Sequence, residues 1–384
     1  MTRRRRPTRT LAAFVALGSS LALVTGCASS DEGDPVSFDT PRSTRHPQQQ
    51  AAQQQHGKGG AGHGKGTGHD GKGTPTGHPD SGGKPGGGVP ETVFPTGPKA
   101  SFTVQRDLDD GTKIGVTELQ GEKSGFTGRV WVWAPKQYFD PAYAETGFPV
   151  LITLPGGKGY PTNYWTGKGI DLPGHINEWV EEGKSLPFIV VMPVLNPDAN
   201  FYYDGSDIPG HPKIGSWLTE DVPDFVRANF RTFASRDGWA FMGSSSGGFV
   251  GLKSVLQKPD RFKAVIASGP DLVPDSPLWK GHERERQANN PERMAAALGR
   301  KPDTPGNQVY VAFQIGTKEV GVAKKVRAFM RTYTKGPLKT RLQVIQDGEH
   351  NARSYMRGMD EGTMAWLSAH LQGPVPMETP ESAS

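Results

Sequence analysis

The sequence of 384 residues contains a single cysteine, Cys27, which excludes a disulfide framework and any metal cluster built on several cysteines. An excess of positive charge is also lacking outside one short segment. The formal net charge is +5, and Arg3 to Arg6 together with Arg9 supply five positive charges. The rest of the chain is therefore close to neutral, which argues against a nucleic-acid partner. Hydrophobic residues make up only 34% of the chain, too few for one packed unit of this length.

The amino-terminal segment has the order of an export signal. Residues 1–10 are basic, and residues 11–24 are mostly apolar and contain no charge. As a helix this apolar stretch would span about 21 Å, short of the roughly 30 Å hydrocarbon core of a membrane. The segment Val24-Thr25-Gly26-Cys27 resembles the bacterial lipobox. We therefore expect residues 1–26 to be a lipoprotein signal peptide, by the Sec or the twin-arginine route, and Cys27 to be lipidated; a buried cysteine that follows a signal is the alternative.

Residues 27–97 have the composition of a disordered tether. Sixteen of the 51 glycines lie in residues 57–97, and the neighbouring residues are mainly histidine, lysine and threonine. Without apolar side chains, such a segment cannot offset the entropy cost of ordering its backbone. Its recurring histidines suggest weak metal binding, but a flexible segment offers no fixed ligand geometry, so a solvated spacer is the preferred interpretation. Residues 98–374 are predicted to be the catalytic domain, and residues 375–384 a disordered tail.

The globular part alternates predicted strands with predicted helices. The apolar runs at 150–154 and 188–192 are typical of parallel strands that are covered on both faces. Residues 113–116 and 129–133 predict an antiparallel pair before them. The remaining strands are expected at 239–242, 262–268, 309–315 and 342–346, and the helices between and after them at 217–230, 248–257, 322–333 and 355–371. This order predicts an α/β fold, with a mainly parallel sheet, helices on both faces and antiparallel N-terminal strands.

The segment Gly243-Ser244-Ser245-Ser246-Gly247 carries the strongest chemical signal. It has the pattern G-x-S-x-G, with an apolar strand before it and an apolar helix after it. A sharp turn from strand to helix strains the central residue, and side chains two positions away on either side would collide there. Glycine at both of those positions predicts Ser245 as the nucleophile. A plain Gly/Ser turn is the alternative.

His350 is the predicted general base. Three histidines follow the nucleophile: His282, His350 and His370. His282 lies in a charged segment and His370 lies near the end of a predicted helix, whereas His350 directly follows the last predicted strand. A loop at that position brings an imidazole over the nucleophile, where it takes the Ser245 proton.

The acid and the oxyanion donors follow from the same topology. In this fold the order along the chain is serine, acid, histidine. Glu319, just after the strand at 309–315, is predicted to orient His350, and Asp271, one strand earlier, is the alternative. The backbone N–H groups of Ser246 and Gly157 are predicted to form the oxyanion hole, because one follows the nucleophile and the other lies in a glycine-rich loop after an early strand.

These segments resemble the esterase D, enterochelin esterase and antigen 85 group of α/β-hydrolases. The matching pieces are Leu154 to Gly157, Trp217 to Pro223, Gly243 to Gly248, Lys258 to Phe262, Glu319 and His350. The resemblance covers most of residues 113–371. It implies serine acyl-enzyme chemistry without a cofactor, acting on esters or moving acyl groups between alcohols. The family often has His-Gly at 155–156 and an aromatic residue soon after the catalytic histidine; this chain departs at both places, so substrate specificity is not carried over.

The sequence thus predicts an extracytoplasmic, lipid-anchored serine esterase that needs no metal. Its expected partners are an ester or acyl-donor small molecule, with a cell-envelope glycolipid as one candidate, and the membrane through Cys27. The alternatives are an antigen 85-like acyltransferase and a non-catalytic envelope-binding protein. Tyr203 and Asp204, beyond the strand at 188–192, are candidate substrate contacts, and residues 163–165 are weaker candidates. A packed surface loop is the other interpretation of both segments.

Overall fold

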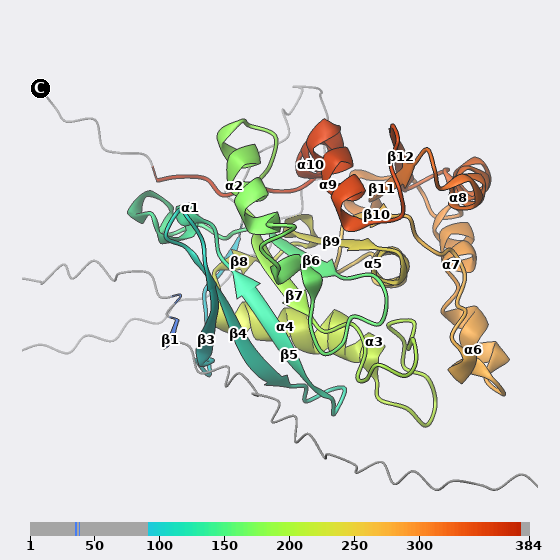
Figure 1. Ribbon diagram of the computed structural model, residues 1–384, viewed down its shortest axis with the longest axis horizontal. Helices are drawn as coiled ribbons and strands as arrows, with labels where there is room; N and C mark the ends of the chain where they lie inside the picture. The colour runs from blue at the N-terminus through green and yellow to red at the C-terminus, as the bar shows by residue number, and fades with distance from the viewer. Residues whose placement is uncertain (1–34, 37, 39–90, 378–384) are drawn as a thin grey trace, which may run out of the picture. The chain divides into compact units, whose positions relative to one another are not determined.

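The computed structural model describes residues 35–36, 38 and 91–377. The predicted signal peptide, Cys27 and nearly all of the predicted tether lie outside the described residues. The described part contains a ten-stranded sheet in the order β1-β3-β4-β5-β7-β6-β9-β10-β11-β12 and a separate pair, β2 and β8 (Figure 1). The strands are β1 (Pro35–Val36), β2 (Thr92–Val93), β3 (Phe102–Asp107), β4 (Lys113–Gln120), β5 (Thr127–Trp133), β6 (Val150–Leu154), β7 (Ile189–Pro193), β8 (Thr232–Phe233), β9 (Trp239–Ser244), β10 (Ala264–Ser268), β11 (Val309–Gly316) and β12 (Leu338–Ile345).

The sheet has two parts of different polarity. Strands β7, β6, β9, β10, β11 and β12 are parallel to one another. Strands β1, β3, β4 and β5 add to the β7 edge in antiparallel fashion. This confirms the predicted fold class, including its antiparallel N-terminal strands. It also brings the carboxyl ends of β9, β11 and β12 to the same edge, where the predicted nucleophile, acid and base follow.

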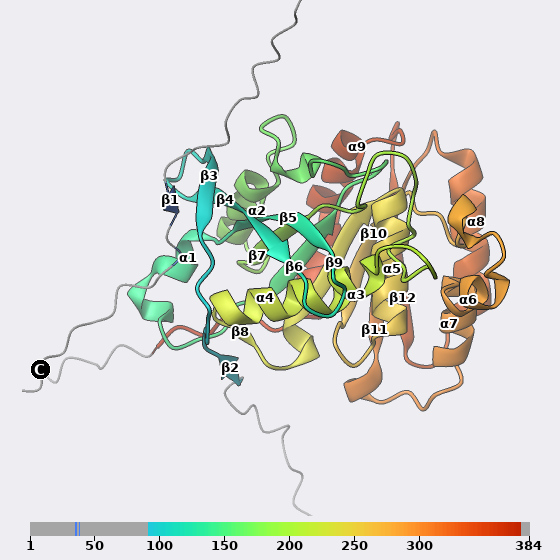
Figure 2. The same cartoon turned by 90° about the horizontal axis from the view of Figure 1, so that it is seen from below.

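Helices cover both faces of this sheet. The helices are α1 (Lys136–Phe139), α2 (Leu172–Glu181), α3 (Ile214–Ser216), α4 (Val222–Asn229), α5 (Ser246–Gln257), α6 (Glu283–Ala288), α7 (Pro291–Leu298), α8 (Val320–Tyr333), α9 (Ala352–Gly358) and α10 (Met364–Ser368). Helices α2, α9 and α10 lie on one face (Figure 1), and the view from below shows α4 and α5 in front of the opposite face (Figure 2). Strands β6, β7, β9 and β10 are buried along their whole length, as their continuous apolar sequences require.

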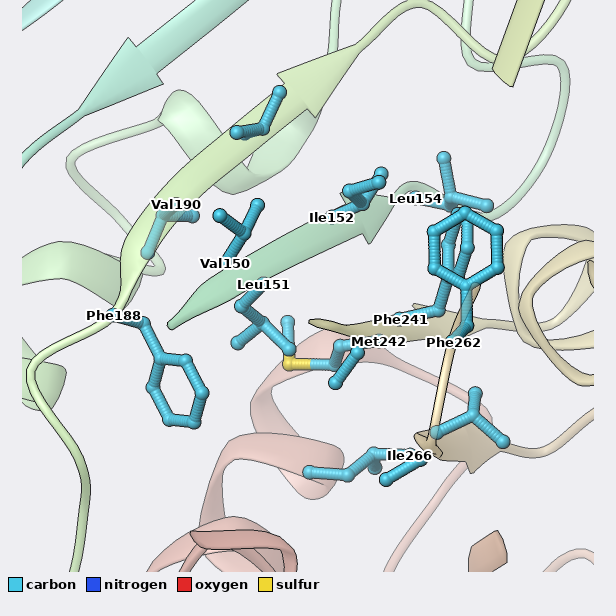
Figure 3. Packing of buried hydrophobic residues seen from close by; sticks show 14 of the residues in the cluster. Val150, Leu151, Ile152, Leu154, Phe188, Val190, Phe241, Met242, Phe262 and Ile266 are labelled. Atoms are coloured by element: carbon cyan, nitrogen blue, oxygen red, sulfur yellow. The ribbon is translucent and has the colours of Figure 1, made fainter. Parts of the chain in front are cut away.

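The core follows the alternation of side chains along the parallel strands. All five side chains of β6 are fully buried. Val150, Ile152 and Leu154 lie on the same face as Phe241 of β9, and Leu151 lies on the other face with Met242 (Figure 3). Because both faces are packed, a shift of either strand by one residue would misplace every one of these side chains.

The helix predicted over residues 355–371 is wrong as a single element. Helix α9 ends at Gly358, a wide turn covers Met359–Thr363, and α10 begins at Met364. Gly362 has φ of 124°, which an α-helix cannot contain. The apolar periodicity continues across the break because both halves pack on the same face of the sheet (Figure 1).

The two ends of the described segment are tied to the domain. Strand β2, which precedes residue 98, pairs with β8. At the other end, the backbone N–H of Met377 donates to the Ala142 carbonyl oxygen at 2.7 Å, and that of Val375 donates to Thr146 Oγ1 at 3.2 Å. The described chain thus packs a few residues beyond each predicted domain boundary.

Candidate active site

Ser245 occupies a strained turn between β9 and α5. Its φ is 52° and its ψ is −122°, and its N–H donates to the Ser268 carbonyl oxygen at 2.8 Å. A Cβ at Gly243 would lie 2.4 Å from the Gly247 carbonyl oxygen, and a Cβ at Gly247 would lie 2.4 Å from that of Pro155. Only glycine fits at either position. The turn therefore exposes the Ser245 hydroxyl at the sheet edge and places the start of α5 beneath it.

Glu319 and His350 form a hydrogen-bonded pair. His350 Nδ1 lies 2.6 Å from Glu319 Oε1, and the Gly316 N–H donates to Glu319 Oε2 at 2.6 Å. The side chain of Glu319 is 3% exposed, whereas that of His350 is 47% exposed. Because a carboxylate only accepts, Nδ1 carries the proton and Nε2 is the ring nitrogen that is available as a base.

Electrostatics keep this pair in the protonation state that a general base requires. Burial alone would raise the pKa of Glu319, but hydrogen bonds from His350, Gly316 and Tyr355 outweigh it and hold that pKa below its ordinary value. The hydrogen bond to Glu319 raises the pKa of His350 above 6.5, against the opposing effect of burial. The carboxylate thus stays charged and stabilises the imidazolium that forms during proton transfer.

Gly269, the residue after β10, connects the nucleophile to this pair. Its neighbour Ser268 accepts the Ser245 N–H, and its own φ is 53°. A Cβ at Gly269 would lie 2.8 Å from Glu319 Oε1 and 2.9 Å from His350 Nδ1. The acid and the base therefore pack directly against the backbone that supports the nucleophile.

The predicted oxyanion donors lie side by side. The Ser246 hydroxyl donates to the Gly157 carbonyl oxygen at 2.7 Å, and a Cβ at Gly156 would lie 3.3 Å from Ser245 Cβ. Within residues 91–377, neither the Gly157 N–H nor the Ser246 N–H has a hydrogen-bond partner in the protein. Gly157 has φ of 66°, a conformation that favours glycine. Two free donors beside the nucleophile are what a developing oxyanion requires.

Tyr164 holds this loop in place. Its hydroxyl accepts the Gly156 N–H at 3.1 Å and makes a very close contact with Ser244 Oγ. The residue was a weak candidate for substrate contact from sequence. In the structure, its hydroxyl is engaged by the loop and by the end of β9 instead.

A cavity of about 160 Å³ opens beside the nucleophile. It is lined by Leu195, Asn196, Tyr202, Asp204, Ser245, Ser246, Phe249, Val250, Asp271 and Asp275. Asp271, the alternative acid, therefore faces the cavity. Glu319, rather than Asp271, accepts the hydrogen bond that His350 donates.

The two tentative substrate contacts have different positions. Asp204 lines the cavity, although its Oδ2 already accepts from Trp279 Nε1 at 2.7 Å and from the Ser276 N–H at 3.1 Å. Tyr203 is 5% exposed and donates its hydroxyl to Asp198 at 2.7 Å, so it belongs to the packed wall. The adjacent Tyr202 faces the cavity in its place. Sequence periodicity does not distinguish the two adjacent tyrosines.

Tyr355 is a component of the site that sequence reasoning missed. It lies on α9 with its hydroxyl 2.8 Å from Glu319 Oε1 and 3.0 Å from His350 Nδ1. The chain does carry an aromatic residue after His350, five positions later. The only sequence signal was its place in a predicted helix that follows His350.

Residues 35–36, 38 and 91–377 contain no group of three or more His, Cys, Asp or Glu side chains arranged to hold a metal ion. The same residues include no helix with the length and apolar character needed to cross a membrane.

The chain is 17% identical to a ferulic acid esterase of known structure, with a TM-score of 0.55, over 68% of this chain and 99% of that one. It is 18% identical to an S-formylglutathione hydrolase from Agrobacterium tumefaciens, with a TM-score of 0.53, over 70% of this chain and 99% of that one. Both likenesses support the fold.

Similarity in sequence is more local. The chain is 24% identical over 180 residues to an uncharacterized protein of Corynebacterium glutamicum, and the match spans 44% of this chain and 41% of that protein. Residues 128–367 match the family model described as "Putative esterase". This confirms the family that the motifs predicted: the chain belongs to this esterase family.

Proposed function

We propose that this protein is a serine hydrolase that cleaves carboxylic esters through an acyl-enzyme on Ser245. The observation that carries the proposal is the Glu319–His350 hydrogen bond of 2.6 Å, packed against the backbone that supports a strained serine. A nucleophile, a base with a free ring nitrogen and a buried acid are the parts that acyl transfer needs.

The reaction proceeds in two halves. Ser245 Oγ attacks the ester carbonyl carbon while His350 Nε2 takes the hydroxyl proton, and the N–H groups of Gly157 and Ser246 stabilise the oxyanion. Collapse breaks the bond to the alcohol, which leaves with the proton from His350. Water then attacks the acyl-enzyme and loses a proton to His350. His350 passes this proton to Ser245 Oγ as the bond from the acyl carbon to Oγ breaks, and the carboxylic acid departs.

Nitrophenyl acetate and a fluorophosphonate probe test this proposal. We expect Ser245→Ala to lower the hydrolysis rate by about a thousandfold or more and to abolish labelling by the probe. Ser185→Ala, at a serine outside the site, should behave as wild type. Equal rates for wild type and Ser245→Ala would refute the assignment. If the acyl-enzyme transfers its acyl group to an added sugar alcohol faster than water hydrolyses it, the protein acts as an acyltransferase.

We also propose that the enzyme is exported and anchored by lipid on Cys27. The support is the basic and then apolar order of residues 1–24 and the lipobox-like Val24-Thr25-Gly26-Cys27. In a bacterial host, the wild type should fractionate with membranes and incorporate labelled palmitate, and Cys27→Ala should do neither. Incorporation of label into both proteins would contradict the anchor and leave the catalytic assignment intact.

A further inference from the structure

Tyr355 places a third polar group on the acid–base pair. Its side chain is 1% exposed, and its ring meets that of His350 edge-on with the centroids 6.0 Å apart. Its hydroxyl lies 2.8 Å from Glu319 Oε1, the same oxygen that accepts the His350 Nδ1 proton at 2.6 Å. A buried hydroxyl in contact with both members of the pair does more than fill space.

The direction of this hydrogen bond follows from the chemistry of its partners. Glu319 is ionised and only accepts, so the Tyr355 hydroxyl is the donor. Burial and the Glu319 carboxylate both raise the pKa of Tyr355, so it remains a donor throughout the working pH range. The contact of 3.0 Å with His350 Nδ1 favours neither protonation state strongly, because Nδ1 carries a proton in both.

Glu319 therefore receives three donors. His350 and Tyr355 share Oε1, and the Gly316 N–H takes Oε2 at 2.6 Å. Each donor stabilises the carboxylate charge and withdraws part of its capacity to stabilise a neighbouring cation. Two other titratable groups act on the cluster: Asp271 acts on His350 from the end of β10, and Tyr164 acts on Tyr355 from the turn Tyr164–Thr166.

We propose that Tyr355 is a positioning residue, which fixes the Glu319 carboxylate in one orientation and limits how strongly this carboxylate stabilises the protonated form of His350. The inference rests on the proposed function of the site. Its consequence is that the base is free of its proton at a lower pH than a two-membered Glu–His pair would allow.

Tyr355→Phe removes only the hydroxyl. We expect the acid limb of the kcat/KM profile to move to higher pH by about half a unit to one unit, and kcat at neutral pH to fall by about 2- to 10-fold, as for loss of one hydrogen bond to a charged group. KM should change less than twofold, because the hydroxyl does not line the cavity. Tyr333→Phe, at the last residue of α8 and without a contact to Glu319 or His350, is the matched control and should leave the profile unchanged.

3-Fluorotyrosine at position 355 tests the same bond in the opposite direction. The fluorine makes the hydroxyl a stronger donor, so the acid limb should move to lower pH while the ring and the fold are retained. This variant also decides the case if Tyr355→Phe does not fold. An acid limb that stays in place with fluorotyrosine, or moves the same way in both variants, would overturn the proposal. If the wild type neither hydrolyses esters nor reacts with a fluorophosphonate, the proposed function fails, a result that differs from an active wild type with an unresponsive Tyr355.

Discussion

Lys253 allows a quantitative prediction about stability. It lies in α5, the helix that follows the nucleophile turn, and is 1% exposed. Its ammonium group donates to the Asp204 carbonyl oxygen at 2.8 Å and to Ser206 Oγ at 2.6 Å, and it closely contacts the Gly205 carbonyl oxygen. The buried cation thereby holds the loop that carries Asp204 to the cavity wall.

The magnitude follows from the shift in its protonation. Burial lowers the pKa of Lys253 from 10.5 to about 8, with Asp204 and Asp207 opposing the shift in part. At 1.36 kcal/mol per unit, the charged form costs the folded state about 3 kcal/mol. The cost is fully present below pH 8. Between pH 8 and 10.5 the unfolded chain binds more protons than the folded one, so stability increases as pH rises.

Urea unfolding near pH 7 and near pH 9.5 measures this effect. Between those two values, Lys253 should return about 2 kcal/mol to the free energy of unfolding of the wild type. Lys253→Met should lack this increment, and Lys280→Met, at an exposed lysine, should retain it. If wild type and Lys253→Met show the same change in unfolding free energy between the two pH values, the reasoning about the buried charge is refuted.

Two further outcomes concern the acid–base pair. Because Glu319 raises the pKa of His350, kcat/KM of the wild type should fall as pH drops through a value above 6.5. In pH–rate profiles on a nitrophenyl ester, Glu319→Gln should move this acid limb to lower pH. An acid limb that does not move would show that Glu319 is not the partner of His350. Gly269→Ala introduces a methyl group that would lie 2.1 Å from Tyr355 Oη, so we expect kcat to fall by about 100-fold while circular dichroism stays native-like, and wild-type turnover in this variant would contradict the described packing.

The parallel half of the sheet could be predicted from the sequence because burial on both faces leaves a plain signal. Strands β6 and β7 are continuous apolar runs, and both were expected within a residue of their observed bounds. Strand β3 was missed, because Phe102–Asp107 is buried only at its first residue and carries mainly polar side chains along the rest. Likewise, β12 begins at Leu338, four residues before the expected start, and residues 339–341 that follow it are only partly buried. An edge or half-covered strand lacks the periodicity that sequence reasoning depends on.

The components of the site also differ in how well the sequence predicts them, because some depend on nearby residues and others on residues far away in the chain. Ser245 could be predicted from the sequence because its strained backbone requires glycines two residues away on either side, within one short segment. Tyr355 was not, because its partner Glu319 is 36 residues away and nothing near either residue requires the other. The contact between Tyr164 and Ser244 joins residues 80 apart, one in the turn Tyr164–Thr166 and one at the end of β9, and cannot be read from the sequence for the same reason.

This difference has a physical basis that goes beyond this chain. A residue held at φ of 52° costs about 1–3 kcal/mol and persists only if close backbone contacts enforce it. Those contacts exclude every side chain at Gly243 and Gly247, so the sequence has a single solution there and shows it. A carboxylate that needs a hydrogen-bond donor accepts one from any residue type with an N–H or O–H and from any element that reaches it. The nucleophile turn can therefore be predicted from the sequence. The contact of Tyr355 with Glu319 and His350 cannot, because it depends on how α9 packs against β11 and β12.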